Sequence, residues 1–228
     1  MEAASNKRGC VIPPPLPDPI RWESAPHPEE MIRRLGLEPD GYLLYSGNLD
    51  SYQELPLLSA ASQRRPGGDR LPIVIACHED TPQDGRLSAR RESTRSGLER
   101  VFVQTAAQMH ALISAARFSV VPRRTGGGFP IKIINSLAAG TAPIVYRARV
   151  GDWGLSEDLD TLVADDRDPV LGLTEALVQA EEDPARARRL GQGARRTYLR
   201  RHRPEVVGAT TLDWIEEVIT AGAPPIGP

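Results

Sequence analysis

Apolar residues along this chain fall into two kinds of segment that alternate. One kind is a short, nearly continuous apolar run, such as 42–46 or 71–77, bounded by Gly, Asn, Asp or Pro. Such runs are typical of strands buried on both faces. The other kind is longer and more polar, with apolar residues every three to four positions, which is typical of helices packed on one side. The expected strands are 42–46, 71–77, 100–104, 118–121, 142–146 and 161–164, and the expected helices are 53–65, 107–116, 129–139, 169–182, 184–202 and 204–221. The segment 29–37 could form a short helix, but it is interpreted as a structured linker.

This order of elements predicts the fold class. Repeated strand–helix units favour a parallel sheet with helices on both faces, which is a doubly wound, Rossmann-like α/β fold. The polar stretch 80–97 has only weak periodicity, and no element is expected there. We expect three parts: a leader with a proline-rich, interdomain-type linker at 1–40, the α/β domain at 41–203, and a helix with a tail at 204–228. The linker contains VIPPPLPDPI, whose prolines favour an extended path.

Composition and charge exclude several classes of function. The chain has 228 residues with a formal net charge of −2, so it has no overall positive field for nucleic acid or an anionic membrane. The arginine-rich helix 184–202 is accordingly interpreted as a solvated face. The two cysteines form no CxxC or Cys/His cluster, which argues against a metal site. Without an apolar run of about 20 residues or the apolar core of a signal peptide, a cytoplasmic protein with no transmembrane segment is expected.

Candidate chemistry lies where a strand, a glycine loop and a helix follow one another. The strand 118–121 continues through Arg123 and Arg124 into three glycines at 126–128, and a helix begins near Phe129. In a parallel sheet the loops at the carboxyl ends of strands line the ligand crevice, and glycine lets the backbone approach a ligand. Because the first N–H groups of a helix have no intrahelical partner, such a start is a natural anion site. The alternative is a merely flexible turn.

Two polar residues share one face of this helix. Lys132 and Asn135 are three residues apart, while the residues around them are apolar. An ammonium group suits a phosphate as a point charge, and an amide that both donates and accepts suits a ribose diol. An ordinary exposed pair of side chains is the alternative interpretation.

The segment GGFPIKIINSLAAGTAPIV resembles the donor-site signature of the retaining glycosyltransferases of family four, which have the two-domain GT-B fold. In that family the motif carries two glutamates, whose positions are occupied here by Gly127 and Asn135. The segments YSGNLDSYQELPLLSAA and MHALISAARFSVVP also resemble the family, and VIPPPLPDPI resembles the proline-containing linker between its two domains. The likeness therefore runs from about Val11 to the C-terminus.

The resemblance implies a substrate and roles for individual residues. The substrate would be a nucleotide diphosphate sugar, with no cofactor and no metal. Lys132 and Arg123 would be catalytic, because they would offset the charge on the leaving diphosphate. Asn135 would orient the ribose, and Gln104 would approach the base. The expected substrate-binding residues are Gly47, Asn48, Gln104, Arg124, Gly126, Gly127, Gly128, Phe129, Pro130, Ile131 and Asn135.

A complete enzyme of this family has a comparable domain before the linker, and that domain is absent from this sequence. We therefore expect a separate acceptor-binding domain or subunit as a partner. The expected function is glycosyl transfer from the nucleotide sugar to an acceptor with the help of that partner. The alternative is a noncatalytic or split half that only binds the nucleotide sugar, and a sugar-nucleotide epimerase is a third, weaker hypothesis.

Overall fold

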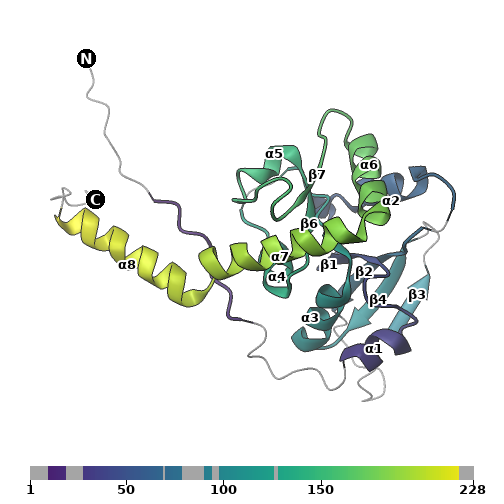
Figure 1. Ribbon diagram of the computed structural model, residues 1–228, viewed down its shortest axis with the longest axis horizontal. Helices are drawn as coiled ribbons and strands as arrows, with labels where there is room; N and C mark the ends of the chain where they lie inside the picture. The colour runs from purple at the N-terminus through teal and green to yellow at the C-terminus, as the bar shows by residue number, and fades with distance from the viewer. Residues whose placement is uncertain are drawn as a thin grey trace.

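The chain forms a seven-stranded sheet covered by helices on both faces (Figure 1). The computed structural model describes residues 10–18, 28–68, 70–78, 90–93, 98–125 and 128–220. The strands are β1 (Leu43–Ser46), β2 (Ile73–His78), β3 (Arg90–Ser93), β4 (Glu99–Val103), β5 (Phe118–Val120), β6 (Pro143–Tyr146) and β7 (Leu162–Ala164). Their order across the sheet is β3-β4-β2-β1-β5-β6-β7.

Six of these strands are parallel, and only the edge strand β3 is antiparallel to its neighbour. From β1 the chain builds outward first through β2 and β4, and then on the other side through β5, β6 and β7. The strand order therefore reverses between β1 and β5. In open α/β sheets, such a switch point leaves a crevice at the carboxyl ends of the strands, where ligands bind.

The helices are α1 (Pro28–Arg34), α2 (Leu55–Arg64), α3 (Ala106–Ala115), α4 (Ile131–Ala139), α5 (Arg147–Val150), α6 (Pro169–Glu182), α7 (Pro184–Arg201) and α8 (Pro204–Thr220), with a short 3-10 turn η2 (Ser51–Gln53). Alternate residues of a strand point to opposite faces. Leu43 and Tyr45 of β1 accordingly pack with α2 and α6, whereas Leu44 packs with α1 and α3. Both faces are buried, which explains the continuous apolar runs in the sequence.

The expected doubly wound α/β fold is confirmed, but two described elements were not expected and several boundaries differ. The segment 29–37 forms the helix α1, which ends at Arg34. Strand β3 lies in the stretch where no element was expected, because its position depends on pairing with β4 rather than on its own pattern. Helix α5 was also missed. Helix α4 begins at Ile131 rather than 129, since Pro130 precedes it with an extended ψ of 118°. Helix α2 begins at Leu55 rather than 53, because Glu54 interrupts the chain with a left-handed φ of 54°.

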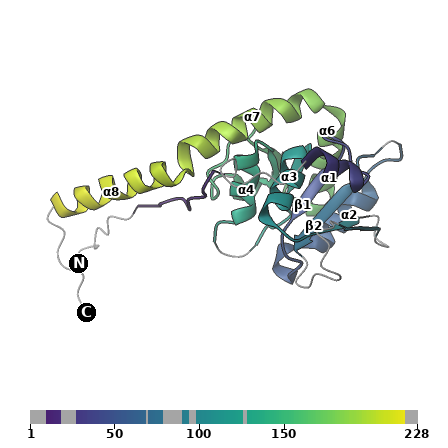
Figure 2. The same ribbon diagram turned by 90° about the horizontal axis from the view of Figure 1, so that it is seen from below.

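The segment 10–18 crosses the carboxyl end of α7, and α8 extends from there away from the sheet (Figure 2). The N–H of Leu16 donates to the carbonyl of His202 at 2.9 Å, and the Tyr198 hydroxyl donates to the carbonyl of Leu16 at 3.0 Å. An ion pair of 2.8 Å joins Arg195 and Asp18.

The division into parts at 1–40, 41–203 and 204–228 stays a prediction. Among the described helices, none is both long enough and apolar enough to span a bilayer.

Candidate functional site

The expected site residues lie at the carboxyl ends of the parallel strands. Gly47 follows β1, Arg123 and Arg124 follow β5, and Gln104 follows β4. Because β1 and β5 are neighbours at the switch point, their loops meet the start of α4. Gln104 lies on the same edge of the sheet, but β2 separates its strand from β1. The backbone N–H of Gln104 donates to the Gln108 side chain at 2.8 Å, so this residue helps to begin α3.

Lys132 is the centre of this arrangement. Its Nζ donates to the Tyr45 hydroxyl at 2.9 Å and to Oε1 of Gln53 at 2.7 Å, and it lies 4.0 Å from the centre of the Tyr45 ring. Within the described ranges no carboxylate lies within ion-pair distance of this ammonium. Burial, with a smaller contribution from the charge of Arg123, lowers the pKa of Lys132 to about 7. A nearby anion would therefore stabilise its charged form strongly.

Gly47 makes room for the Lys132 ammonium. It has a φ of +125°, and a Cβ built at this position would lie 3.3 Å from Nζ of Lys132. A side chain here would both strain the backbone and press on the ammonium. The N–H of Gly47 already donates to the carbonyl of Ala76 at 2.9 Å, so this amide is committed to the sheet. The contribution of Gly47 to the site is therefore the space that it leaves.

Asn48 holds the loop after β1 in shape. Its amide donates to the Tyr52 hydroxyl at 3.1 Å and to the Asp50 carboxylate, and its Oδ1 accepts from Gln53 at 3.0 Å. The Tyr45 hydroxyl donates to the Asn48 carbonyl at 2.6 Å. Asn48 therefore orients the two neutral groups that bind Lys132.

Sequence reasoning missed those two neutral groups. Tyr45 was interpreted only as a strand residue and Gln53 as the start of a helix. Tyr45 could have been found from its position in a buried strand, because the hydroxyl of a buried tyrosine needs a hydrogen-bond partner. For Gln53, which is only 5% exposed, the sequence around it carries no comparable signal.

The two arginines after β5 lie in different surroundings. Arg123 is buried, its Nε donates to the Thr125 carbonyl at 3.0 Å, and its guanidinium lies 5.5 Å from the centre of the Tyr52 ring. Arg124 faces Glu54 at 3.4 Å and lies 5.9 Å from the Tyr146 ring. The Nε of Arg124 is buried and makes no hydrogen bond to any described residue. It is therefore a spare donor beside the site.

The start of α4 exposes backbone N–H groups. Gly126 and Gly127 lie outside the described residues, and Gly128 has a left-handed φ of +80°. Pro130 precedes the helix without a side-chain cap, and its carbonyl accepts from the N–H of Ile133 at 2.9 Å. The N–H groups of Ile131 and Lys132 thus have no helical partner, as in any first turn. The side chain of Ile131 is 51% exposed beside them.

Phe129 and Asn135 flank this helix start. The Phe129 ring packs against the His202 ring at the end of α7, with 5.5 Å between the centroids, so its side chain contributes packing. Asn135 is half-buried one turn after Lys132, and its amide makes no hydrogen bond within the described part of the chain. An amide in this position can still donate to and accept from a ligand.

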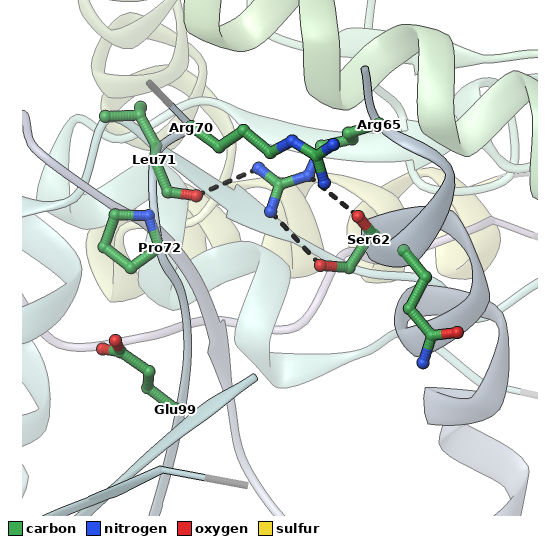
Figure 3. Close-up of a pocket in the computed structure, with 7 residues that line it drawn as sticks. Ser62, Arg65, Arg70, Leu71, Pro72 and Glu99 are labelled. Atoms are coloured by element: carbon green, nitrogen blue, oxygen red, sulfur yellow. Dashed lines mark hydrogen bonds between the residues drawn. The ribbon is translucent and has the colours of Figure 1, made fainter. Parts of the chain in front are cut away.

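Two cavities lie at the other end of the parallel strands from the expected site residues. One, of about 530 Å³, is lined by residues near the end of α2 and the starts of β2 and β4, including Ser62, Arg65, Arg70 and Leu71 (Figure 3). The other, of about 280 Å³, is lined by residues that include Asp40, Arg117 and Arg188. Both lie by the amino ends of the parallel strands, away from the residues expected to bind a ligand. In the first cavity Arg65 is already neutralised by Glu181.

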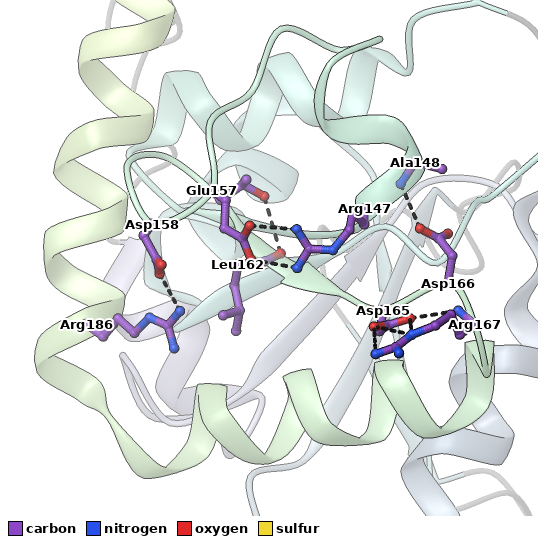
Figure 4. A network of polar contacts seen from close by, with 10 residues as sticks. Arg147, Ala148, Glu157, Asp158, Leu162, Asp165, Asp166, Arg167 and Arg186 are labelled. Atoms are coloured by element: carbon purple, nitrogen blue, oxygen red, sulfur yellow. Dashed lines mark hydrogen bonds and ion pairs between the residues drawn. The ribbon is translucent and has the colours of Figure 1, made fainter.

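A polar network covers the side of the domain formed by α5, β7 and the helices after it (Figure 4). Arg147 pairs with Glu157 at 2.8 Å, and Arg167 pairs with Asp165 at 2.8 Å. These side chains are largely exposed, and solvent screening leaves such pairs with little effect on the stability of the fold. Among the described residues no group of three or more His, Cys, Asp or Glu side chains is placed to hold a metal ion.

The family model described as glycosyl transferases group 1 matches residues 28–197, and the chain belongs to this family. The resemblance noted in the sequence is thereby confirmed at this level, while membership of family four stays a prediction. No match was found among the curated proteins.

Solved structures of glycosyltransferases share the fold at low identity. Sucrose-phosphate synthase from Thermosynechococcus elongatus is 19% identical, with a TM-score of 0.68 over 92% of this chain and 53% of the other. HepE from Anabaena in complex with UDP is 13% identical, with a TM-score of 0.65 over 85% and 54%. The C-terminal domain of the group 1 protein LpcC from Francisella tularensis is 14% identical, with a TM-score of 0.58 over 82% and 98%. The chain thus spans about half the length of the first two structures.

Proposed function

We propose that this chain is the donor-binding half of a retaining glycosyltransferase of family four, which binds a nucleotide diphosphate sugar. The observation that carries the proposal is the ammonium of Lys132. It lies at the switch point of the sheet, its partners are the neutral oxygens of Tyr45 and Gln53, and no described carboxylate pairs with it. A buried cation is normally paired. A diphosphate supplies the missing negative charge.

The transfer breaks the bond between the anomeric carbon of the sugar and the diphosphate oxygen, and negative charge develops on that oxygen. Three positive groups lie where they would offset this charge: Lys132, Arg123 and the start of α4. Fixed charges and dipoles stabilise such a transition state because they need no reorganisation during the reaction. Their presence supports leaving-group stabilisation without a metal ion. No cofactor takes part in this proposal.

The rest of the donor is assigned by position. Asn135 has an amide without a described hydrogen bond one turn beyond Lys132, which suits the ribose diol, and Gln104, which follows β4, would approach the base. Arg124 has one spare donor for the diphosphate. The HepE structures carry UDP or UDP-glucose, which makes uridine nucleotides the first ligands to try.

A separate domain or subunit would hold the acceptor. This part of the proposal is supported by the share of each solved structure that the chain matches. It matches 53% of sucrose-phosphate synthase but 98% of the isolated C-terminal domain of LpcC. The rival function is a noncatalytic half that binds the nucleotide sugar only. One observation favours it: Gly127 and Asn135 stand where the family signature carries carboxylates.

Calorimetry with UDP, GDP, ADP and their glucose conjugates tests donor binding. We expect the wild-type chain to bind at least one of them and Lys132→Met to bind it more weakly. Arg33→Met, which removes an exposed positive charge from α1, is the matched control and should bind normally. No binding by the wild type to any of these ligands would refute the proposal. Measuring sugar transfer or hydrolysis with the same ligands then separates an enzyme from a binding half.

A further inference from the structure

Glu54 has a strained backbone. It lies between η2 and α2 with φ 54° and ψ 34°, the left-handed region that favours glycine. A residue with a Cβ is disfavoured there because the Cβ crowds the following carbonyl oxygen. Such strain persists only where the surroundings impose it, and it clusters at functional sites. The contacts of the Glu54 side chain show what imposes it here.

The Glu54 carboxylate reaches from the loop after β1 to the loop after β5. Its Oε2 accepts from the backbone N–H groups of Arg124 and of Thr125, the latter at 3.3 Å. Its Oε1 accepts from the Arg124 guanidinium at 3.4 Å. The side chain is only 17% exposed. From the other side Arg149 donates its Nε–H to the carbonyl of Arg124 at 2.6 Å. The peptide group between Arg124 and Thr125 is therefore held at its carbonyl by Arg149 and at its N–H by Glu54.

The two loops that Glu54 joins lie on either side of the switch point. The first carries Gly47 and the partners of Lys132, and the second carries Arg123 and leads into the glycines and α4. If the second loop moved, Arg123 and the start of α4, which carries Lys132, would move relative to Gly47 and to Tyr45 and Gln53, the partners of Lys132. A bare carboxylate near a diphosphate would repel it, but the oxygens of Glu54 are already occupied by three N–H donors.

We infer that Glu54 is a positioning residue for the diphosphate site: it fixes the loop after β5 against the loop after β1 so that the positive groups converge on one anion. Glu54 itself does not touch the donor. This inference rests on the proposed function, because it assumes that the site binds a nucleoside diphosphate. It adds a residue that sequence reasoning did not single out.

Two substitutions test the inference. Glu54→Gln keeps the length of the side chain but replaces one of its two acceptor oxygens by an N–H₂ group, which must face either the backbone N–H donors or the Arg124 guanidinium. Glu54→Gly removes both the carboxylate and the backbone strain. We expect each variant to bind UDP about tenfold more weakly, while binding of UMP, which lacks the second phosphate, changes about twofold. Amide hydrogen exchange at Arg124 and Thr125 should quicken in both variants. Glu157→Gln, which removes an exposed carboxylate from the Arg147 pair, is the matched control and should match the wild type.

Each outcome decides the question. Weaker UDP binding with nearly unchanged UMP binding, and with Glu54→Gly melting above Glu54→Gln, supports the positioning role. If the wild type binds UDP and Glu54→Gln binds it equally well, the inference is wrong while the proposed function stands. Equal losses of UDP and UMP together with a large fall in melting temperature would show a role in folding alone, and would overturn the inference. If the wild type binds no nucleoside diphosphate, both proposals are wrong.

Discussion

Two cations near opposite ends of the parallel strands, the buried Arg65 and the half-buried Lys132, differ in the groups that surround their charges. Arg65 is 5% exposed and pairs with the Glu181 carboxylate. It also donates to the carbonyl of Leu71 at 3.0 Å (Figure 3). Among the described residues, Lys132 contacts the Tyr45 hydroxyl, the Gln53 amide oxygen and the face of the Tyr45 ring. The charge of Arg65 is neutralised by Glu181 within the fold, so we expect its role to be structural. Under the proposed function, the charge of Lys132 is neutralised by the diphosphate of the bound donor.

The pKa values of the two side chains differ because only Arg65 has a described carboxylate as its partner. Burial lowers the pKa of the Arg65 guanidinium, and Glu181 opposes that shift, so the group stays charged. No described carboxylate opposes the shift at Lys132, and its pKa falls to about 7. A buried charge without a partner is unfavourable, and losing a proton is the usual response. The two ends of the parallel strands should therefore respond differently to substitution.

The largest expected effect is on stability at the Arg65 end. Arg65→Met leaves the Glu181 carboxylate without its partner, and breaking a buried pair in this way costs about 3 kcal/mol in the free energy of unfolding. Urea unfolding measures this loss. The affinity of the folded variant for UDP should be unchanged, because the carboxyl edge of the sheet is untouched. A loss below about 1 kcal/mol would mean that the Arg65 pair is no more important than an exposed one.

The next effect is on binding at the Lys132 end. Lys132→Met removes a charge-assisted contact to the diphosphate, and we expect UDP affinity to fall about 30-fold, or about 2 kcal/mol. Its urea unfolding should change far less than that of Arg65→Met. Calorimetry and unfolding on the same two variants thus give opposite patterns. If both lost stability and neither lost affinity, the contrast between the two cations would be wrong.

Gly47→Ala sharpens the contrast by disturbing Lys132 without removing it. The new Cβ would be strained at φ +125° and would lie 3.3 Å from Nζ. We expect a loss of about 1–2 kcal/mol in the free energy of unfolding. UDP binding should also weaken. Gly151→Ala is the comparison, because a Cβ there meets no atom within 4 Å. Equal behaviour of the two variants would contradict the proposed role of Gly47.

The smallest expected effect concerns Asn135. Asn135→Ala removes the side-chain amide and with it a neutral hydrogen bond to the ribose. We expect UDP affinity to fall about fivefold, or about 1 kcal/mol. Inorganic pyrophosphate has no ribose and should bind as in the wild type. Isothermal titration with both ligands checks this. Equal weakening of both would place Asn135 at the phosphates instead.

Much of the fold was predictable because the apolar runs and the alternation of strands and helices follow from burial on both faces. Strand β3 was not predictable, since an edge strand pairs through its backbone and needs no apolar pattern. For the site, the sequence indicated Lys132, Gly47 and the start of α4. It did not indicate Gln53 or Glu54, because each acts on a residue about 70 to 80 positions away. Such contacts depend on which strands become neighbours, and only the folded sheet brings them together.

The most direct test of the account is whether donor binding protonates Lys132. Because the pKa of this amine is about 7 in the free chain, most of the group is neutral at pH 8, and a bound diphosphate should raise its pKa. Calorimetry at pH 8 in buffers of different ionisation enthalpy should therefore show uptake of about one proton per UDP, with affinity falling as the pH rises above about 7. Lys132→Met should abolish the uptake. Tight UDP binding with no proton uptake, and equally tight in Lys132→Met, would contradict the account.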